Sequence, residues 1–298
     1  MNTILAYLLG PIIALYVTTP LVLDGVERKL RAMLQSRIGP PITQTIYDVL
    51  KLLLVKETKS HPTLLYVSLS LVSSIITGLA ALYYTTLYIV EGNSTYMFYA
   101  LALFAISTST HTITPLLVPN PYSFIGGMRE VILAVVNEAA LITSISLYTI
   151  VTQRLLVEST SLTSLIAVLL IAIVAFTASY VASSRVPFDI AEAEPELASG
   201  MLVEFSGRIL ALNIYTLLLK RLIVKFLVLA PTLTLIYKYG LITLLSTLIL
   251  IPVVWVIYAT IAVLLGRSRV DVAPLTLAKI YIALILISIT VLLVLTHA

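Results

Sequence analysis

The sequence predicts an all-α polytopic membrane protein with about eight transmembrane helices and one amphipathic helix at the membrane interface. Of the 298 residues, 60% are hydrophobic and only 11% are charged, and the mean hydropathy is +1.08. A soluble domain carries about 25% charged residues, so lipid is the solvent for which this chain is built. We expect a single membrane domain over residues 1–298.

Eight apolar segments are long enough to cross a bilayer, because a helix needs about 20 mostly apolar residues to do so. They cover residues 3–23, 64–90, 96–118, 131–151, 160–182, 208–236, 240–264 and 274–296. The first segment has no basic residues before it and no cleavage site of the A-x-A kind. We therefore interpret it as a permanent anchor and not as a signal peptide.

Basic residues indicate the orientation, because cytoplasmic loops are enriched in Lys and Arg. With eight spans, one side carries Arg28, Lys29, Arg31, Arg37, Lys51, Lys56, Lys59, Arg129, Arg185, Arg208, Arg267 and Arg269. The other side carries only Arg154 and Lys238. We expect a cell-membrane protein with both termini outside and with the loops 24–63 and 183–207 in the cytoplasm. The same topology explains the net charge of +4 without a nucleic acid as partner.

The loop 24–63 contains a predicted amphipathic helix from Ile42 to Lys56. Its apolar residues at helical spacing are Ile42, Ile46, Val49, Leu50 and Leu53. The segment is too short to cross the membrane, so we expect it to lie in the interface. Gly39-Pro40-Pro41 gives it a stiff entrance, because proline fixes its own φ and restricts the residue before it. A solvated linker is the alternative.

The stretch "RVPFDIAEAEPELASGMLVEFSG", residues 185–207, gathers five carboxylates and one arginine between two apolar segments. The carboxylates are those of Asp189, Glu192, Glu194, Glu196 and Glu204. Arg185 alone cannot neutralise them. Either they are solvated and dock on a basic partner, or several share protons, as a proton relay requires. The residues themselves leave both interpretations open.

Charged residues also occur inside the predicted spans, where they usually mark an ion pathway or a buried pair. Glu130 lies at the start of the fourth span and Glu138 about two turns into it. In the sixth span we expect Lys220 and Arg221 to be buried, paired bases, with the two glutamates or a neighbouring subunit as partners. Lys225 is expected to reach toward the outer surface.

We expect no catalytic residue, cofactor or metal site in this chain. The absence of cysteine excludes disulfides, thiolate-bound zinc and cysteine-held iron–sulfur clusters within it. The histidines, His61, His111 and His297, are too scattered to suggest a metal site. His111 is expected to form a hydrogen bond between two helices. Electrons, if they move nearby, are carried by other subunits.

The 185–207 stretch resembles the corresponding loop of the subunit 1 family of respiratory complex I. That family's pattern is R-x-P-F-D-x-x-E-A-E-x-E-L-x-x-G-x-x-x-E-Y-S-G, and only Phe205 departs from it, in place of tyrosine. "ERKLRAMLQSRIGPP" resembles the family's first loop through Glu27, Arg28, Arg37, Gly39 and Pro40. "GGMREVILAVVNEAAL" resembles its fourth-span motif through Arg129 and Glu138. "RIGPP" and "YDVLKLLLVKE" look more like the membrane-bound NiFe-hydrogenase branch, which includes formate hydrogenlyase and energy-converting hydrogenases.

The resemblance implies a non-catalytic subunit that couples electron transfer in a peripheral arm to proton or sodium translocation. Its partners would be iron–sulfur and large catalytic subunits, which hold 4Fe–4S clusters and a NiFe centre, together with antiporter-like and small membrane subunits. The loop acids Asp189, Glu192, Glu194, Glu196 and Glu204 would form the entrance of an ion path. Glu138 and Glu130 would continue that path. The residues that would shape a docking surface or balance charge are Arg37, Arg185, Arg28 and Arg129.

Three alternatives stay open at this point. A quinone-chamber subunit of a quinone-reducing oxidoreductase and a subunit of a sulfane reductase belong to the same family. A stand-alone secondary transporter belongs to another class, and it would show an internal repeat with discontinuous spans around a midplane site.

Overall fold

The computed structural model describes residues 2–54, 62–157, 162–190, 200–202, 204–269 and 272–297. Within these ranges the ordered elements are helices, and no strand occurs. They are α1 (Asn2–Leu34), α2 (Gln44–Leu54), α3 (Pro62–Glu91), α4 (Ser94–Ile113), η1 (Thr114–Leu117), α5 (Pro121–Val157), α6 (Leu162–Ala182), η3 (Gly200–Leu202), α8 (Gly207–Tyr237), α9 (Leu241–Leu264) and α10 (Val272–His297). The predicted all-α fold is confirmed for this part of the chain.

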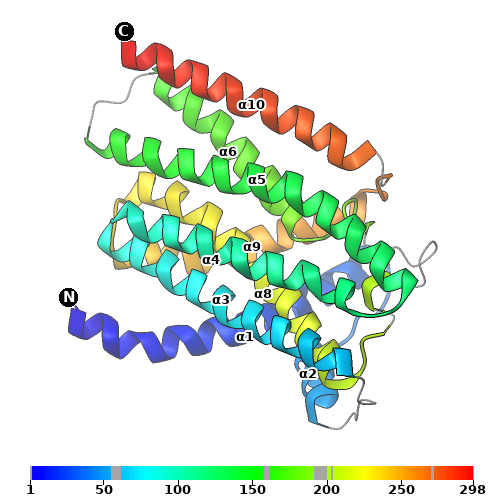
Figure 1. The fold of residues 1–298 in the computed structure, drawn as a ribbon. Coiled ribbons are helices and arrows are strands. Elements are labelled where there is room, and N and C mark those ends of the chain that lie inside the picture. Colours follow the sequence, from blue (N-terminus) through cyan, green and yellow to red (C-terminus); the bar gives the residue numbers. More distant parts are fainter. Residues whose placement is uncertain are drawn as a thin grey trace.

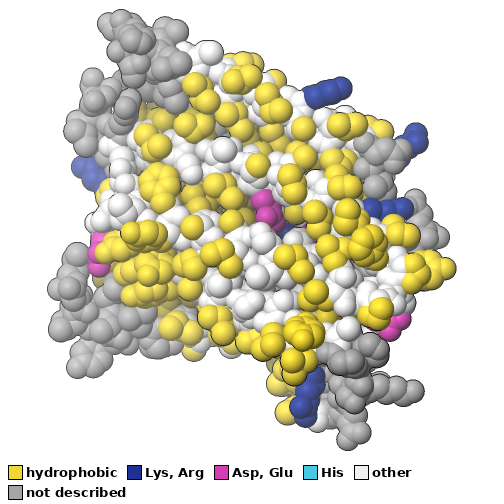
Figure 2. Space-filling view, in the orientation of Figure 1, with side chains coloured by type: hydrophobic (Ala, Val, Ile, Leu, Met, Phe, Trp, Pro, Cys, Tyr) yellow, Lys and Arg dark blue, Asp and Glu magenta, His cyan; other side chains and the backbone are white. Residues whose placement is uncertain are grey.

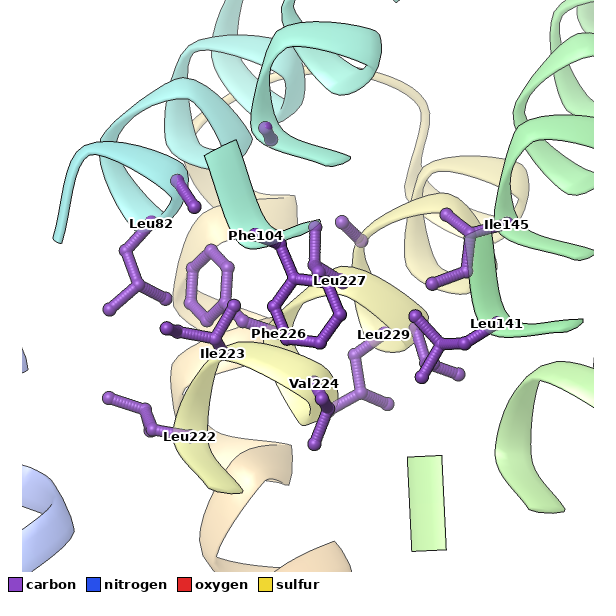
Figure 3. Packing of buried hydrophobic residues seen from close by; sticks show 14 of the residues in the cluster. Leu82, Phe104, Leu141, Ile145, Leu222, Ile223, Val224, Phe226, Leu227 and Leu229 are labelled. Carbon is purple, nitrogen blue, oxygen red and sulfur yellow. The ribbon is translucent and has the colours of Figure 1, made fainter. Parts of the chain in front are cut away.

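Helix α8 runs through the interior of the bundle, and most of the other helices pack around it (Figure 1). It contacts α1, α2, α3, α4, α5, α6 and α9. Figure 3 shows its apolar residues from Leu222 to Leu229 among Leu82 of α3, Phe104 of α4 and Leu141 of α5. Protein therefore surrounds much of α8, whereas lipid would surround the outer faces of the other helices.

Six of the described helices are long and apolar enough to cross a membrane, namely α3, α4 with η1, α5, α6, α9 and α10. Helix α8 has a comparable length, but Lys220, Arg221 and Lys225 interrupt its apolar sequence. Six of the eight predicted spans thus satisfy the requirement of length and composition. Membrane crossing by α1 and α8 stays a prediction.

The two ends of the chain lie at the same end of the bundle, and α2 lies at the opposite end (Figure 1). On the face shown in Figure 2, hydrophobic and uncharged side chains cover most of the surface. Basic side chains on this face lie mainly at the end away from the termini, and one acidic patch lies near its centre. The molecule is therefore polarised along the helix axes.

Of the described helices, α1 and α5 extend farthest beyond their predicted spans. Helix α1 continues to Leu34, into the predicted loop 24–63, and α5 begins at Pro121. Arg129 and Glu130 consequently lie well inside α5 and not at its start. Asn120 explains the early start, because its Oδ1 accepts the backbone N–H of Tyr122 at 2.8 Å and proline suits the first helical position.

Helix α2 occurs where the amphipathic helix is predicted, although it begins at Gln44 and not at Ile42, and residues 55–61 lie outside the described part. Thr45 and Val49 face the bundle and are buried. Tyr47, Leu50 and Leu54 point away from it and are exposed. One face of α2 thus binds protein, and the other presents apolar side chains.

Gly25 allows the chain at the start of α2 to lie directly against α1. A β-carbon at this position would overlap the carbonyl group of Ile42. Two polar contacts hold the same junction: Thr45 Oγ1 donates to Asp24 Oδ2 at 2.9 Å, and Arg28 donates to Asp48 Oδ2 at 2.8 Å. The position of α2 therefore depends on the lack of a side chain at Gly25.

We expect the Gly25→Ala variant to lose about 1–3 kcal/mol of unfolding free energy, because the main chain at Ile42 must move to admit the methyl group. Equilibrium unfolding of the purified chain in mixed micelles of a mild and a denaturing detergent measures this loss. Gly266→Ala is the matched control, since a β-carbon there meets no described atom within 4 Å. Equal stability of the two variants would contradict the close docking of α2.

Candidate functional site

Lys220 of α8 lies between two carboxylates of α5. Its Nζ is 3.6 Å from Oε1 of Glu130 and 3.4 Å from Oε1 of Glu138. On the other side, Oε2 of Glu138 accepts a hydrogen bond of 2.7 Å from Thr108 Oγ1 of α4. The two glutamates share one face of α5 because they are about two helical turns apart. We call Glu130, Glu138 and Lys220 the Glu–Lys triad.

The Glu–Lys triad has two charge states that differ by one proton. All three side chains are largely shielded, with exposed fractions of 6% for Glu130, 13% for Glu138 and 7% for Lys220. With both carboxylates ionised, the triad has a net charge of −1, and one added proton makes it neutral. A site of this composition can take up and release a proton without any other chemical change.

A second group of charges surrounds Glu27 of α1, which is 1% exposed. Arg185 donates from Nε to Glu27 Oε1 at 3.2 Å, and a terminal nitrogen of the same guanidinium donates to Oε2. Trp255 Nε1 of α9 donates to Oε2 at 2.7 Å. Arg31 donates to Oε1 at 2.6 Å. We call Glu27, Arg31, Arg185 and Trp255 the arginine cluster.

The arginine cluster is a fixed ion pair at neutral pH. Burial raises the pKa of the Glu27 carboxyl, but the positive charges of Arg221, Arg185 and Arg31 outweigh burial and lower that pKa to about 2. Burial lowers the pKa of Arg185 to about 10, and Glu27 opposes this effect. Both groups therefore stay charged.

Arg221 of α8 lies between Asp24 of α1 and the connection after α6. Its guanidinium lies 3.7 Å from Oδ1 of Asp24 and donates from Nε to the carbonyl of Ser183 at 2.9 Å. The next residue, Ser184, donates from Oγ to Oε1 of Glu130 at 3.4 Å. A series of polar contacts thus runs from α1 through the connection after α6 to the Glu–Lys triad.

Lys220 is buried and paired, as predicted, whereas Arg221 is only partly buried, and the acid that it meets is Asp24 and not an α5 glutamate. The prediction that Lys225 reaches the outer surface is wrong. Its side chain is 1% exposed, Nζ donates to the carbonyl of Arg221 at 2.9 Å, and the Trp255 ring lies 4.3 Å away. The physical reason is that α8 lies inside the bundle, so protein and not water surrounds Lys225.

The described residues place only part of the predicted ion entrance. Asp189 is paired with Arg267 at 3.0 Å. Glu204 is exposed and accepts a hydrogen bond of 2.5 Å from Asn120. Neither touches the Glu–Lys triad in this part of the chain. The other predicted entrance acids, Glu192, Glu194 and Glu196, lie outside the described residues.

The predicted docking arginines lie in different surroundings. Arg37 is exposed and its guanidinium binds Gln35, whereas Arg185 is 1% exposed and pairs with Glu27. Arg28 joins α1 to α2 through Asp48. Arg129 is half-buried on α5. Of the two roles predicted for Arg185, charge balance fits its position and surface docking does not.

His111 forms the predicted helix–helix contact. It is 3% exposed, and its Nε2 lies 3.1 Å from Oδ1 of Asn213, which joins α4 to α8. Among the described residues, no group of three His, Asp or Glu side chains is arranged to hold a metal ion.

The site also contains three residues that the sequence analysis did not predict from residue type and position, namely Asp24, Glu27 and Trp255. Of these, Glu27 was named only as part of the family resemblance. A local signal exists, because Asp24 precedes Arg28 and Glu27 precedes Arg31 by four residues, the spacing of a helical ion pair. Both pairs form in α1. No comparable signal marks Trp255, whose partner Glu27 is far away in the sequence.

The chain is similar to known membrane subunits along most of its length. A family described as NADH dehydrogenase matches residues 7–293. Hydrogenase-4 component C from Escherichia coli is 30% identical over 236 residues, 75% of this chain and 74% of that protein. Formate hydrogenlyase subunit 4 from Escherichia coli is 29% identical over 225 residues, 71% of this chain and 72% of that protein. A subunit of the NADH-quinone oxidoreductase from Geobacillus thermodenitrificans is 31% identical over 202 residues, 61% of this chain and 59% of that protein.

A solved structure supports the fold independently. A chain of the archaeal membrane-bound sulfane sulfur reductase aligns with a TM-score of 0.72 and 20% identity, covering 97% of this chain and 100% of that chain. At this identity the similarity shows a shared fold.

We expect Glu27→Gln to lose about 3–5 kcal/mol of unfolding free energy at pH 7, because the variant leaves Arg185 buried without its counter-ion. Unfolding in mixed micelles gives the value. Asp189→Asn is the control, because the pair between Asp189 and the 40% exposed Arg267 is worth about 1 kcal/mol or less. A loss for Glu27→Gln no larger than that for the control would refute the assignment of Glu27 as the buried anchor.

Proposed function

Because the chain belongs to the NADH dehydrogenase family, we propose that it anchors and couples a multi-subunit, redox-driven ion pump of the membrane-bound NiFe-hydrogenase type. Membrane subunits of hydrogenase-4 and formate hydrogenlyase are among its relatives, as is a subunit of an NADH-quinone oxidoreductase. The two hydrogenase-type matches extend over 75% and 71% of the chain, and the quinone-type match extends over 61%. This difference favours the hydrogenase type.

One observation carries the proposed coupling role: buried charges form a connected series from α1 to the middle of the bundle. Asp24 meets Arg221, Arg221 binds the Ser183–Ser184 backbone, and Ser184 reaches Glu130 in the triad. A purely structural anchor needs no such series, because buried charges are costly and apolar residues pack at least as well.

Proton exchange in the Glu–Lys triad is the step that the series would control. A unit charge that appears about 10 Å away, at an effective dielectric constant of about 20, changes the energy of a carboxylate by about 1.7 kcal/mol. This is more than the roughly 1.36 kcal/mol that corresponds to one pKa unit, so such a change suffices to move a proton. The charge change would come from a redox centre in a partner subunit.

The predicted topology completes the proposal. Eight crossings, with α1 and α8 included, bring both termini to one side, and Figure 1 has both at one end of the bundle. The basic end would face the cytoplasm by the positive-inside rule. Helix α2 would lie in the interface there, with Tyr47, Leu50 and Leu54 toward lipid.

The partners would bind at this cytoplasmic end. The peripheral arm would supply iron–sulfur and large catalytic subunits, with 4Fe–4S clusters and the NiFe centre, and antiporter-like and small membrane subunits would adjoin the bundle. Arg37 is exposed and suits a docking surface. Asp189 and Glu204 would belong to the ion entrance, together with the loop acids outside the described residues. Measuring transport with and without sodium ions distinguishes a proton from sodium as the translocated ion.

A quinone-binding role is the second candidate, and one observation favours it. An apolar groove of about 330 Å³ opens between α1, α8 and α9, lined among others by Tyr16, Leu222 and Pro252. Its walls suit an isoprenoid chain. A quinone that copurifies with the native complex, or inhibition by quinone-site inhibitors, would select this candidate.

We expect Glu138→Gln in the native complex to abolish ion translocation and to leave electron transfer to soluble acceptors within about twofold of wild type. The amide keeps the shape of the side chain but cannot carry the proton. Reconstituted vesicles with a pH-sensitive dye measure translocation, and a soluble acceptor assay measures electron transfer.

The exposed Glu91 at the end of α3 offers the control variant Glu91→Gln, which should translocate ions at the wild-type rate. Undiminished translocation by Glu138→Gln would contradict the role of the triad. Nickel in the purified complex would support the hydrogenase type, and iron without nickel would speak against it.

A further inference from the structure

Lys225 is a buried cationic side chain that the proposed ion path does not use. Its Nζ is enclosed by two aromatic rings, with centroids at 4.3 Å for Trp255 and 5.1 Å for Tyr258. Its hydrogen bond goes to a backbone carbonyl, that of Arg221. Among the described residues it forms no ion pair. A lysine this deeply buried normally has a carboxylate partner.

The charged and titratable groups that face Lys225 are Arg221 on its own helix, Glu27 on α1, Arg185 in the connection after α6 and Tyr258 on α9. Two of these are cations and one is an anion. The anion is already shared by two arginines and the Trp255 indole. The protonated form of Lys225 is therefore poorly compensated, and the attraction of the two rings for a cation is its main support.

Lys220 provides a direct comparison on the same helix. It lies within 3.6 Å of two carboxylates, which hold it as an ammonium group. Lys225 follows it by five residues, about 7.5 Å along the helix axis. The two lysines of α8 therefore have opposite electrostatic surroundings, one rich in anions and one rich in cations.

We propose that Lys225 is a second proton-binding residue of this subunit, whose amine takes up and releases a proton within the enclosure of Trp255 and Tyr258. The proton comes from water and returns to it, and no other bond forms or breaks. Movement of the Arg185 charge away from the Trp255 ring favours proton uptake, because Arg185 lies over the same ring, 5.1 Å from its centroid.

The surroundings of Arg185 suggest the event that would move this charge. The outer guanidinium nitrogen of Arg185 that does not bind Glu27 is buried and finds no hydrogen-bond partner within the described ranges. Arg185 also lies in the connection after α6 and begins the acidic stretch 185–207. A change in that loop would therefore reach Lys225 through Arg185. The role of this change in ion pumping rests on the proposed function, whereas the proton exchange itself does not.

Trp255 provides the readout, because it is the only tryptophan of the chain and lies against Lys225. We expect its fluorescence, recorded on the full chain in detergent micelles, to change in one transition as the pH is raised, because loss of the proton removes the positive charge from the Trp255 ring. Lys225→Met should remove the transition and keep the high-pH emission at all pH values. Lys238→Met, which changes an exposed lysine next to the end of α8, should retain it.

Two further variants test the proposal where Lys225→Met does not fold. Lys225→Arg keeps a permanent positive charge over the ring, so its emission should stay at the low-pH level without a transition. Arg221→Gln removes a neighbouring cation and should move the midpoint to higher pH.

The proposal is overturned if wild type shows no transition, if either Lys225 variant titrates like wild type, or if Arg221→Gln leaves the midpoint unchanged. These outcomes are independent of the Glu138→Gln transport assay. A failure of the Lys225 proposal is therefore distinguishable from a failure of the proposed function.

Discussion

The positive charges on α8 constrain the whole bundle. Lys220, Arg221 and Lys225 lie on a helix that protein surrounds on most sides, and an uncompensated buried charge costs several kcal/mol. Their partners come from α5, from α1 with the connection after α6, and from the aromatic rings of α9. The helices around α8 are thereby fixed in rotation and depth, which apolar packing alone does not achieve. The same contacts that hold the fold form the candidate site.

The two groups of charges have complementary properties. The arginine cluster holds Glu27 and Arg185 in a permanent pair, which sets a fixed electrostatic field beside the Lys225 part of α8. The Glu–Lys triad has a carboxylate in excess over ammonium and can therefore exchange a proton. Arg221 pairs with Asp24 of α1, and Ser184 donates a hydrogen bond to Glu130 of the triad. In the proposed function, this combination lets a distant charge change the proton occupancy of the triad without a large movement of the backbone.

Much of the fold and part of the site could be predicted from the sequence. Apolar length locates the helices, and an acid such as Glu138 within an apolar segment is a functional candidate because its burial is expensive. The prediction for Lys225 failed because exposure of a basic side chain depends on which helix is central, a property of the assembled bundle. The pairing of Glu27 could not be predicted from the sequence either, because its partner Arg185 is 158 residues away. The spacing of charged residues predicts ion pairs within one helix but not ion pairs between helices.

The central claim is that a charge change outside the membrane alters the proton occupancy of the Glu–Lys triad. Redox-induced infrared difference spectroscopy of the native complex observes this occupancy directly through the stretching band of protonated carboxyl groups. The account predicts a band that appears or disappears when the electron carriers are reduced and that is missing from the Glu138→Gln complex. A carboxyl region that is unchanged on reduction, or an identical band in the Glu138→Gln complex, would contradict it.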